Sequence, residues 1–285
     1  MKKFSHPFMH LLVLALWALV MMVVAVLIGV AIGVSGKPDD APEGFLLYNV
    51  LVQLLTFALP VLLVTWMYYR DSQRTFYKLD FSRRPWLLAL AGVALLFLLV
   101  PLTDWLATWN DNWHFSGAWE PLERRLRDTG EQSEQAVESL MRGHHPLLNL
   151  FGMALVPALC EELFFRAGIQ NLLQRWFKNG HVAVWLAAAI FSLAHGELFA
   201  FLPRLLLGAL LGYLYLYGRS LVVNVTVLFV NNAIIVAAYA LLAGGSSDFD
   251  PSAPLAVPPL LTVASSLAAL VLFYFVFLRH PSRQQ

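Results

Sequence analysis

The sequence predicts an all-α protein, a multi-pass transmembrane helical bundle of about eight spans. Of its 285 residues, 59% are hydrophobic and only 13% are charged. A soluble domain is about half apolar and about a quarter charged. The mean hydropathy is +0.66, and several long segments contain no charged residue. The formal net charge of +1 gives no basic excess, so a lipid bilayer is the expected partner and nucleic acid is not.

The first apolar segment runs from Leu11 to Gly36 without a charged residue and follows Lys2 and Lys3. The apolar region of a secretory signal is about 7–15 residues long, whereas a membrane-spanning helix needs about 20. We therefore expect an uncleaved first transmembrane helix.

Seven further apolar segments are predicted to span the membrane. They are Phe45–Tyr69, Pro85–Thr103, Leu147–Phe177, His181–Ala200, Pro203–Gly218, Leu221–Ala243 and Leu255–Leu278. The sixth of the eight spans, Pro203–Gly218, is expected to be short. Between the third and fourth spans, the polar stretch 104–145 has apolar residues at roughly helical spacing. This pattern predicts interfacial helices that are interrupted near Gly130.

The chain divides into four parts on this reading. Residues 1–110 form N-terminal transmembrane helices, and residues 111–146 form an extracytoplasmic polar or interfacial segment. Residues 147–243 form a core that contains the unusual polar residues, and residues 244–285 form a C-terminal helix and tail. Cys160 is the single cysteine, which excludes an internal disulfide.

The loop charges predict the orientation in a cell membrane. With the N-terminus inside, 12 of the 19 lysine and arginine residues lie on the cytoplasmic side. Six lie on the outer side, Arg204 among them, and Arg166 lies within a span. Cytoplasmic loops carry an excess of Lys and Arg. Both termini are therefore expected to be cytoplasmic.

The fourth span contains three charged residues, Glu161, Glu162 and Arg166. One charge near the bilayer centre costs about 2.5–3.5 kcal/mol on insertion scales, so these side chains need partners or a wet cavity. Glu162 and Arg166 are four residues apart and can form an ion pair on one face, while Glu161 points about 100° away. Two interpretations stay open. The group is a structural ion pair with one protonated glutamate, or Glu161 is a general base supported by Glu162 and Arg166.

Two further helices carry polar residues. In the fifth span, Phe191 and His195 lie one turn apart, and His195 is either a packing residue or a partner for Glu161. Counted at 1.5 Å per residue from the predicted helix starts, Glu161 and His195 differ in depth by roughly 12 Å. In the seventh span, Asn224, Asn231 and Asn232 either bridge helices or donate to an oxyanion.

The sixth span contains Gly208 and Gly212 in a small-xxx-small spacing. This spacing lets two membrane helices approach closely, because the glycines present no side chain at the contact.

Together, the segments EELFFR, FSLAH, and GALLGYLY followed by SLVVNVTVLFVNN resemble a known family. It is the CAAX protease and bacteriocin-processing (CPBP) family, also called the Abi family, of intramembrane endopeptidases. Its pattern is a double-Glu–xxx–Arg motif, then Phe–xxx–His, then His–xxx–Asn, on consecutive core helices. The resemblance covers about Pro157 to Asn232. It implies hydrolysis of peptide bonds in a membrane-associated protein or peptide, by a water that Glu161 and His195 activate.

The resemblance also implies supporting roles. Glu162 and Arg166 would hold the first motif in shape, and Asn232 would help to stabilise the tetrahedral oxyanion. Members have been called metalloproteases, but the reaction of a water held by Glu161 and His195 requires no metal cofactor. One histidine with carboxylates offers fewer good ligands than zinc sites usually have, so zinc is not expected, although it is not excluded.

The sequence departs from the family in its third motif, because Leu228 stands where the motif has histidine. Leucine can neither orient water nor donate to an oxyanion. Asn224, one turn earlier, is the candidate replacement. A non-catalytic membrane partner or chaperone with the same fold therefore stays open. A small transporter is a weaker alternative, since no inverted repeat is evident.

Overall fold

The computed structural model describes residues 6–33, 42–77, 85–143, 146–243, 253 and 255–279. Within these ranges every regular element is a helix, so the predicted all-α bundle is confirmed. Seven helices are long and apolar enough to cross a membrane: Pro7–Ala31, Gly44–Tyr68, Pro85–Asp111, Pro146–Phe177, Leu198–Gly218, Leu221–Leu242 and Pro259–Leu278. An eighth apolar helix, α10 (Gly180–Ala194), has only 15 residues. Lys2, Lys3, Arg83 and Arg84, which contribute to the predicted orientation, lie outside the described residues.

Several spans are built from more than one element. The first three are α1 (Pro7–Ala31), then α2 (Pro42–Gln53) with η1 (Leu54–Ala58) and α3 (Leu59–Tyr68), then α5 (Pro85–Asp111). The fourth combines α7 (Pro146–Asn149), η4 (Leu150–Leu155), α8 (Val156–Glu161), η5 (Glu162–Gln170) and α9 (Asn171–Phe177). After α10 come η6 (Leu198–Ala200) with α11 (Phe201–Gly218), α12 (Leu221–Ala243), and α13 (Pro259–Phe273) with η7 (Tyr274–Leu278). Shorter elements are η2 (Arg70–Ser72), α4 (Gln73–Tyr77) and η3 (Gly117–Trp119), which precedes α6 (Glu120–Gly143).

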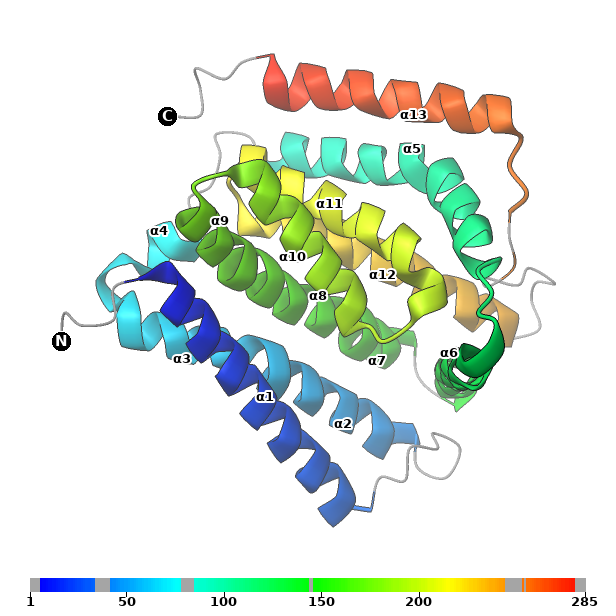
Figure 1. Cartoon of the computed structure of the whole chain (residues 1–285), viewed down its shortest axis with the longest axis horizontal. Helices are drawn as coiled ribbons and strands as arrows, with labels where there is room; N and C mark the ends of the chain where they lie inside the picture. The colour runs from blue at the N-terminus through cyan, green and yellow to red at the C-terminus, as the bar shows by residue number, and fades with distance from the viewer. Residues whose placement is uncertain are drawn as a thin grey trace.

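The helices with the three sequence motifs occupy the centre of the bundle (Figure 1). In that view, α8, α10, α11 and α12 lie between α1–α3 on one side and α5 with α13 on the other. The start of α1 and the end of α13 lie at the same end, whereas α6 lies at the opposite end. This arrangement agrees with an even number of crossings. It also surrounds the charged residues of the fourth span with protein.

Proline explains two irregular turns within the spans. The π-helical turns η1 and η4 end immediately before Leu59-Pro60 and Val156-Pro157. A proline has no N–H for the carbonyl of the preceding turn, so the helix widens locally and its hydrogen bonds shift by one residue. The π-helical η5 begins at Glu162 without a proline, and π-helical turns are frequent at functional sites.

The fifth and sixth spans differ from the prediction. The fifth was expected over His181–Ala200, but α10 ends at Ala194 because the chain turns at Gly196, whose φ is +72°. That dihedral lies in the left-handed region, which glycine adopts without a steric penalty. The sixth span begins earlier than expected and runs over 21 residues, Leu198–Gly218. The short helix is thus the fifth, not the sixth.

The predicted interruption near Gly130 is wrong, because α6 is one continuous helix over Glu120–Gly143. A glycine in a helix costs only about 1 kcal/mol relative to alanine, and good helix formers lie within one turn on both sides of it, Leu126 and Arg127 before and Glu131 and Gln132 after. The apolar face of α6 buries Leu140 and Met141, and Met141 packs against Val236 of α12. This packing continues the helix across Gly130.

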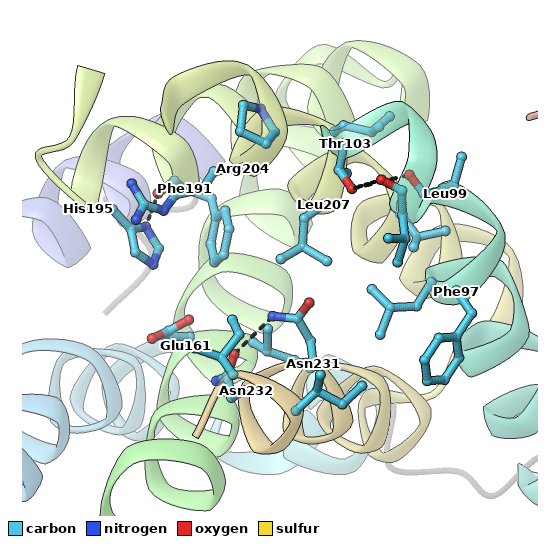
Figure 2. A pocket seen from close by; sticks show the side chains of 18 residues that line it. Phe97, Leu99, Thr103, Glu161, Phe191, His195, Arg204, Leu207, Asn231 and Asn232 are labelled. Carbon is cyan, nitrogen blue, oxygen red and sulfur yellow. Dashed lines mark hydrogen bonds between the residues drawn. The ribbon is translucent and has the colours of Figure 1, made fainter. Parts of the chain in front are cut away.

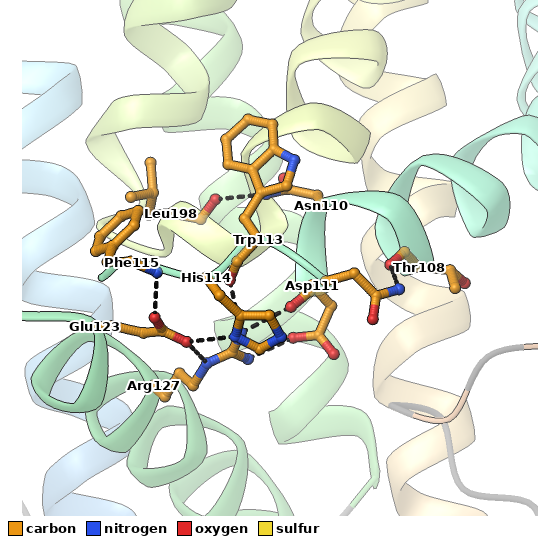
Figure 3. A network of polar contacts seen from close by, with 10 residues as sticks. Thr108, Asn110, Asp111, Trp113, His114, Phe115, Glu123, Arg127 and Leu198 are labelled. Atoms are coloured by element: carbon orange, nitrogen blue, oxygen red, sulfur yellow. Dashed lines mark hydrogen bonds and ion pairs between the residues drawn. The ribbon is translucent and has the colours of Figure 1, made fainter. Parts of the chain in front are cut away.

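A polar network fastens α6 to the end of α5 (Figure 3). Arg127 donates from Nη1 to Oδ1 of Asp111 at 2.7 Å and from Nε to Oε1 of Glu123 at 3.0 Å. Glu123 also accepts a hydrogen bond from the N–H of Phe115 at 2.6 Å, and its Oε1 lies 3.0 Å from Nδ1 of His114. These hydrogen bonds, the Phe115 amide first, lower the pKa of Glu123 to about 2.

The same region holds the segment between α10 and α11. The guanidinium of Arg127 lies 3.9 Å from the centre of the Phe199 ring. Asn110, which is fully buried, donates to the carbonyl of Leu198 at 3.1 Å and accepts from the N–H of Leu202 at 2.8 Å. Non-helical backbone at membrane depth is stable only where protein groups or water in a cavity form hydrogen bonds with its N–H and C=O groups. Helices α5 and α6 therefore fix the segment that follows His195.

Candidate functional site

The predicted ion pair of the first motif is present in the centre of the bundle. Glu162 and Arg166 are both fully buried, with Nη2 of Arg166 3.4 Å from Oε1 of Glu162. The other oxygen of Glu162 accepts a hydrogen bond from Nδ2 of Asn224 at 3.0 Å. Asn224 therefore connects α12 to η5. Glu161 is the last residue of α8 and points elsewhere, into a cavity.

The geometry does not give Asn224 the compensating role that was expected for it. Its Nδ2 donates both to Glu162 and to the carbonyl of Leu211, the latter at 2.6 Å. An amide nitrogen has two hydrogens, so both are used. Asn224 is thus a bridge between helices, and it does not replace the missing histidine at the cavity that Leu228 lines.

A cavity of about 400 Å³ brings the other motif residues together (Figure 2). The motif residues and Arg204 in the lining come from α8, the end of α10, α11 and α12, and they are Glu161, Phe191, His195, Arg204, Leu228, Asn231 and Asn232; Thr103 of α5 is a further polar lining residue. Most of the remaining lining is apolar and comes from α5, α11 and α12. The residues predicted for water activation and for the oxyanion therefore share one cavity.

The hydrogen bonding of His195 determines which of its ring nitrogens carries a hydrogen. It caps the C-terminus of α10, and its Nδ1 lies 2.7 Å from the carbonyl oxygen of Phe191. Because a carbonyl can only accept, Nδ1 carries the hydrogen and Nε2 of the neutral ring has a free lone pair. Phe191 also packs its ring 4.7 Å from the ring of His195 and 5.1 Å from the guanidinium of Arg166. The Phe191 ring thus contacts side chains of both the first and the second motif.

On α12, Leu228 lines the cavity one turn before Asn231 and Asn232. Nδ2 of Asn231 donates to Oδ1 of Asn232 at 3.2 Å. This bond occupies the oxygen of Asn232 and leaves its nitrogen as a donor. Leu228 is 1% exposed, so an apolar side chain fills the position of the family histidine.

Glu161 lies between two cavities. Together with Asn232 and Ile235 it also lines a second cavity of about 240 Å³, which α2, η4 and α6 help to enclose. The side chain of Gln53 lines this second cavity and interacts electrostatically with the carboxyl group of Glu161. Gln53 was not among the candidate residues predicted from the sequence. The available signal was a pair of amides, Asn49 and Gln53, one turn apart within an apolar span.

Arg204 was also missed, because its charge was counted in an outer loop. It lies in the first turn of α11 and lines the larger cavity. Its Nη2 forms an ion pair with Oε2 of Glu197. The signal available was its position nine residues after His195, which keeps it near the same helix ends.

The residues present do not fit a zinc site. In the described ranges, no three His, Cys, Asp or Glu side chains lie close enough together to hold one metal ion. Glu161 and His195 are the only such side chains that line the larger cavity, whereas zinc sites use three or four protein ligands. Water activation at this cavity is therefore assigned to side chains alone.

A comparison with family models finds a match that covers the motifs. Residues 143–234 match the family model described as type II CAAX prenyl endopeptidase Rce1-like. No curated protein and no solved structure matches the chain. The matched segment contains all three motifs and the lining contributed by α8, α10, α11 and α12. It supports a function of the CAAX-type intramembrane protease kind. Residues 143–234 of this multi-pass membrane protein thus match the model of the Rce1-like family of type II CAAX prenyl endopeptidases, which is consistent with the family that its motifs resemble.

Proposed function

We propose that the chain is an intramembrane endopeptidase that hydrolyses a peptide bond of a membrane-associated protein or peptide. The observation that carries this proposal is the cavity shared by Glu161, His195 and Asn232, which come from three helices. The loop charges favour a cell-membrane location with both termini in the cytoplasm.

The reaction follows from the chemistry of these side chains. A water between Glu161 and Nε2 of His195 gives a proton to the carboxylate, and its oxygen bonds to the carbonyl carbon of the substrate. The carbonyl oxygen becomes an oxyanion, for which Nδ2 of Asn232 is a donor. When the tetrahedral intermediate collapses, the C–N bond breaks and Glu161 returns the proton to the leaving amine. The products are a carboxylic acid and an amine.

The lining of the cavity limits the substrate. Besides the polar residues it presents Phe97, Leu99 and Leu207, and other aliphatic side chains of α5 and α11. A segment with an apolar group beside the cleaved bond would bury that group here, at about 25 cal/mol per Å² removed from water. We therefore propose substrates that are themselves associated with the membrane.

Purified protein incubated with labelled hydrophobic peptides tests the proposal. The unaltered chain should cleave some of them, and Glu161→Gln should abolish cleavage, because the amide cannot accept the proton of water. The thermal unfolding of Glu161→Gln should stay close to that of the unaltered chain. Arg124→Gln, an exposed change on α6, is the matched control. Full activity in Glu161→Gln would show that this glutamate is not the base.

A second candidate is a non-catalytic membrane partner or chaperone, and Leu228 is the observation that favours it. Its side chain fills the cavity wall where the family motif has an imidazole. If correctly folded protein cleaves no peptide, and Leu228→His does not produce cleavage either, the non-catalytic function becomes the better proposal.

A further inference from the structure

Arg204 places a charged hydrogen-bond donor at the larger cavity. Its Nη2 pairs with Glu197, but its Nη1 is shielded from solvent and has no hydrogen-bond partner among the described residues. Arg204 interacts electrostatically with both Glu161 and His195. Figure 2 shows these three side chains at the same end of the cavity. A buried guanidinium N–H that has no acceptor raises the free energy of the folded protein. An anionic group bound in the cavity would supply an acceptor.

The other polar side chains of the lining have fewer free hydrogens. The hydroxyl of Thr103 bonds the carbonyl of Val100 in its own helix at 2.8 Å. The Nδ1–H of His195 is used by Phe191, and one hydrogen of Asn231 is used by Asn232. Among the described lining residues, Arg204 alone combines a permanent positive charge with a free N–H.

We propose that Arg204 is a catalytic residue that donates from Nη1 to the tetrahedral oxyanion, opposite the amide of Asn232. It would thereby supply the donor that Leu228 cannot supply. The inference rests on the proposed peptidase function. No additional reactant is needed. As water adds to the carbonyl carbon, negative charge develops on the carbonyl oxygen, and this N–H donates a hydrogen bond to it. The hydrogen bond weakens when the C–N bond breaks and the carbonyl re-forms.

The preference for the oxyanion follows from where charge appears during the reaction. The substrate carbonyl is neutral in the ground state, and its oxygen becomes anionic only in the transition state. A fixed guanidinium donor in an apolar cavity therefore stabilises the transition state more than the bound substrate. It should act on kcat rather than on KM.

Arg204→Gln tests the role with a side chain of similar reach and no charge. Removing one oxyanion donor typically lowers kcat by about 100- to 1,000-fold, so kcat should fall by this amount with little change in KM. Leu228→His should recover part of the lost rate in the Arg204→Gln background, since it adds a donor to the same cavity. Arg124→Gln again serves as the charge-loss control. An unchanged kcat in Arg204→Gln, with Glu161→Gln inactive, would overturn the role of Arg204 and leave the peptidase function intact.

Binding of a peptide phosphinate gives a readout that does not depend on turnover. This tetrahedral anion should lose affinity in Arg204→Gln by the same factor as kcat/KM, whereas the parent amide peptide should bind the two proteins equally. Peptides with a free or an amidated C-terminus provide the second arm. If the loss appears only with the free carboxylate, Arg204 binds the substrate terminus in the ground state, and the oxyanion role is wrong. If the unaltered chain binds the phosphinate no more tightly than the amide peptide and does not cleave the amide peptide, both proposals fail.

Discussion

Replacing Arg166 by methionine isolates the energetics of the buried ion pair. Glu162 and Arg166 are both inaccessible, and 3.4 Å separates the charged atoms. At an effective dielectric constant near 20, their attraction is about 5 kcal/mol. Removing two ions from water costs several kcal/mol for each ion. Moreover, all three guanidinium nitrogens of Arg166 and Oε1 of Glu162 lack a hydrogen-bond partner in the described residues. The pair thus contributes little net stability, and each partner mainly offsets the cost of the other.

The single and double variants should therefore behave very differently. Arg166→Met leaves Glu162 as a buried carboxylate with one donor, Asn224, and should destabilise the fold by about 3–5 kcal/mol. At about 2–4 °C per kcal/mol for a chain of this size class, Tm should fall by roughly 6–20 °C. Adding Glu162→Leu removes the stranded charge, and the double variant should return to the stability of the unaltered chain or exceed it by about 1–4 kcal/mol.

Thermal unfolding of the four proteins in one detergent forms a double-mutant cycle that measures the coupling directly. Coupling of several kcal/mol is expected. If the double variant is as unstable as Arg166→Met, the loss comes from the packing of the arginine against Phe191. The argument from stranded charge would then be refuted.

Three further predictions concern other parts of the molecule. A Cβ on Gly208 would lie 3.0 Å from the Cα of Ala188, so Gly208→Ala should destabilise the fold by about 1–3 kcal/mol through overpacking. Gly130 lies in open space on α6, so Gly130→Ala should instead stabilise the fold by up to about 1 kcal/mol. Thermal unfolding measures both changes. The pKa of Glu123 is lowered from 4.5 to about 2, so its contribution is complete above pH 4.5 and is lost as the pH falls toward 2; Tm measured over this range should fall less in Glu123→Gln. A reporter fused after Gln285 should be cytoplasmic and one inserted near Gly130 exported, and finding both on one side would contradict the eight-crossing topology.

Most of the fold was predictable because apolar length alone determines it. Uncharged segments long enough to cross a membrane form helices, because the bilayer core contains no water to bond the backbone and a helix pairs its own N–H and C=O groups. The boundaries were less predictable. A single dihedral at Gly196 ends α10 early. Glycine often follows the last residue of a helix, but it is also frequent inside membrane helices, so its presence alone did not identify the turn. The continuity of α6 depends on packing against α12, which its own sequence does not contain.

The pairing of Glu161 with His195 was predicted by motif, but counting depth gave a misleading separation of roughly 12 Å. The fourth span is 32 residues long and rises about 48 Å, more than the hydrocarbon core of about 30 Å, so its first residue is a poor reference for depth. Counted instead from the end at Phe177, Glu161 lies about 24 Å along its helix. Counted from the neighbouring start at Gly180, His195 lies about 22 Å along α10. The two residues therefore lie at nearly the same level, and both line the larger cavity.

The roles of Arg204 and Gln53 depend on tertiary structure. An arginine at the start of a helix is normally a solvated loop charge, and only the return of α11 beside α10 brings Arg204 to the cavity. Gln53 lies more than a hundred residues before Glu161 in the sequence and reaches it because α2 packs against α8. Neither relationship leaves a periodic or local pattern.

The early end of α10 also bears on the lipid around the protein. Its 15 residues rise about 22 Å, while the hydrocarbon core of a typical bilayer is about 30 Å thick. The bilayer beside α10 must then become locally thinner, or longer neighbouring helices must cover the part of the hydrocarbon core that α10 does not span. Such hydrophobic mismatch costs fractions of a kcal/mol per Å and sorts proteins among membranes. A thin bilayer would accommodate α10 and bring the water layer closest to His195, so acyl-chain length is expected to set where in a mixed membrane this protein gathers.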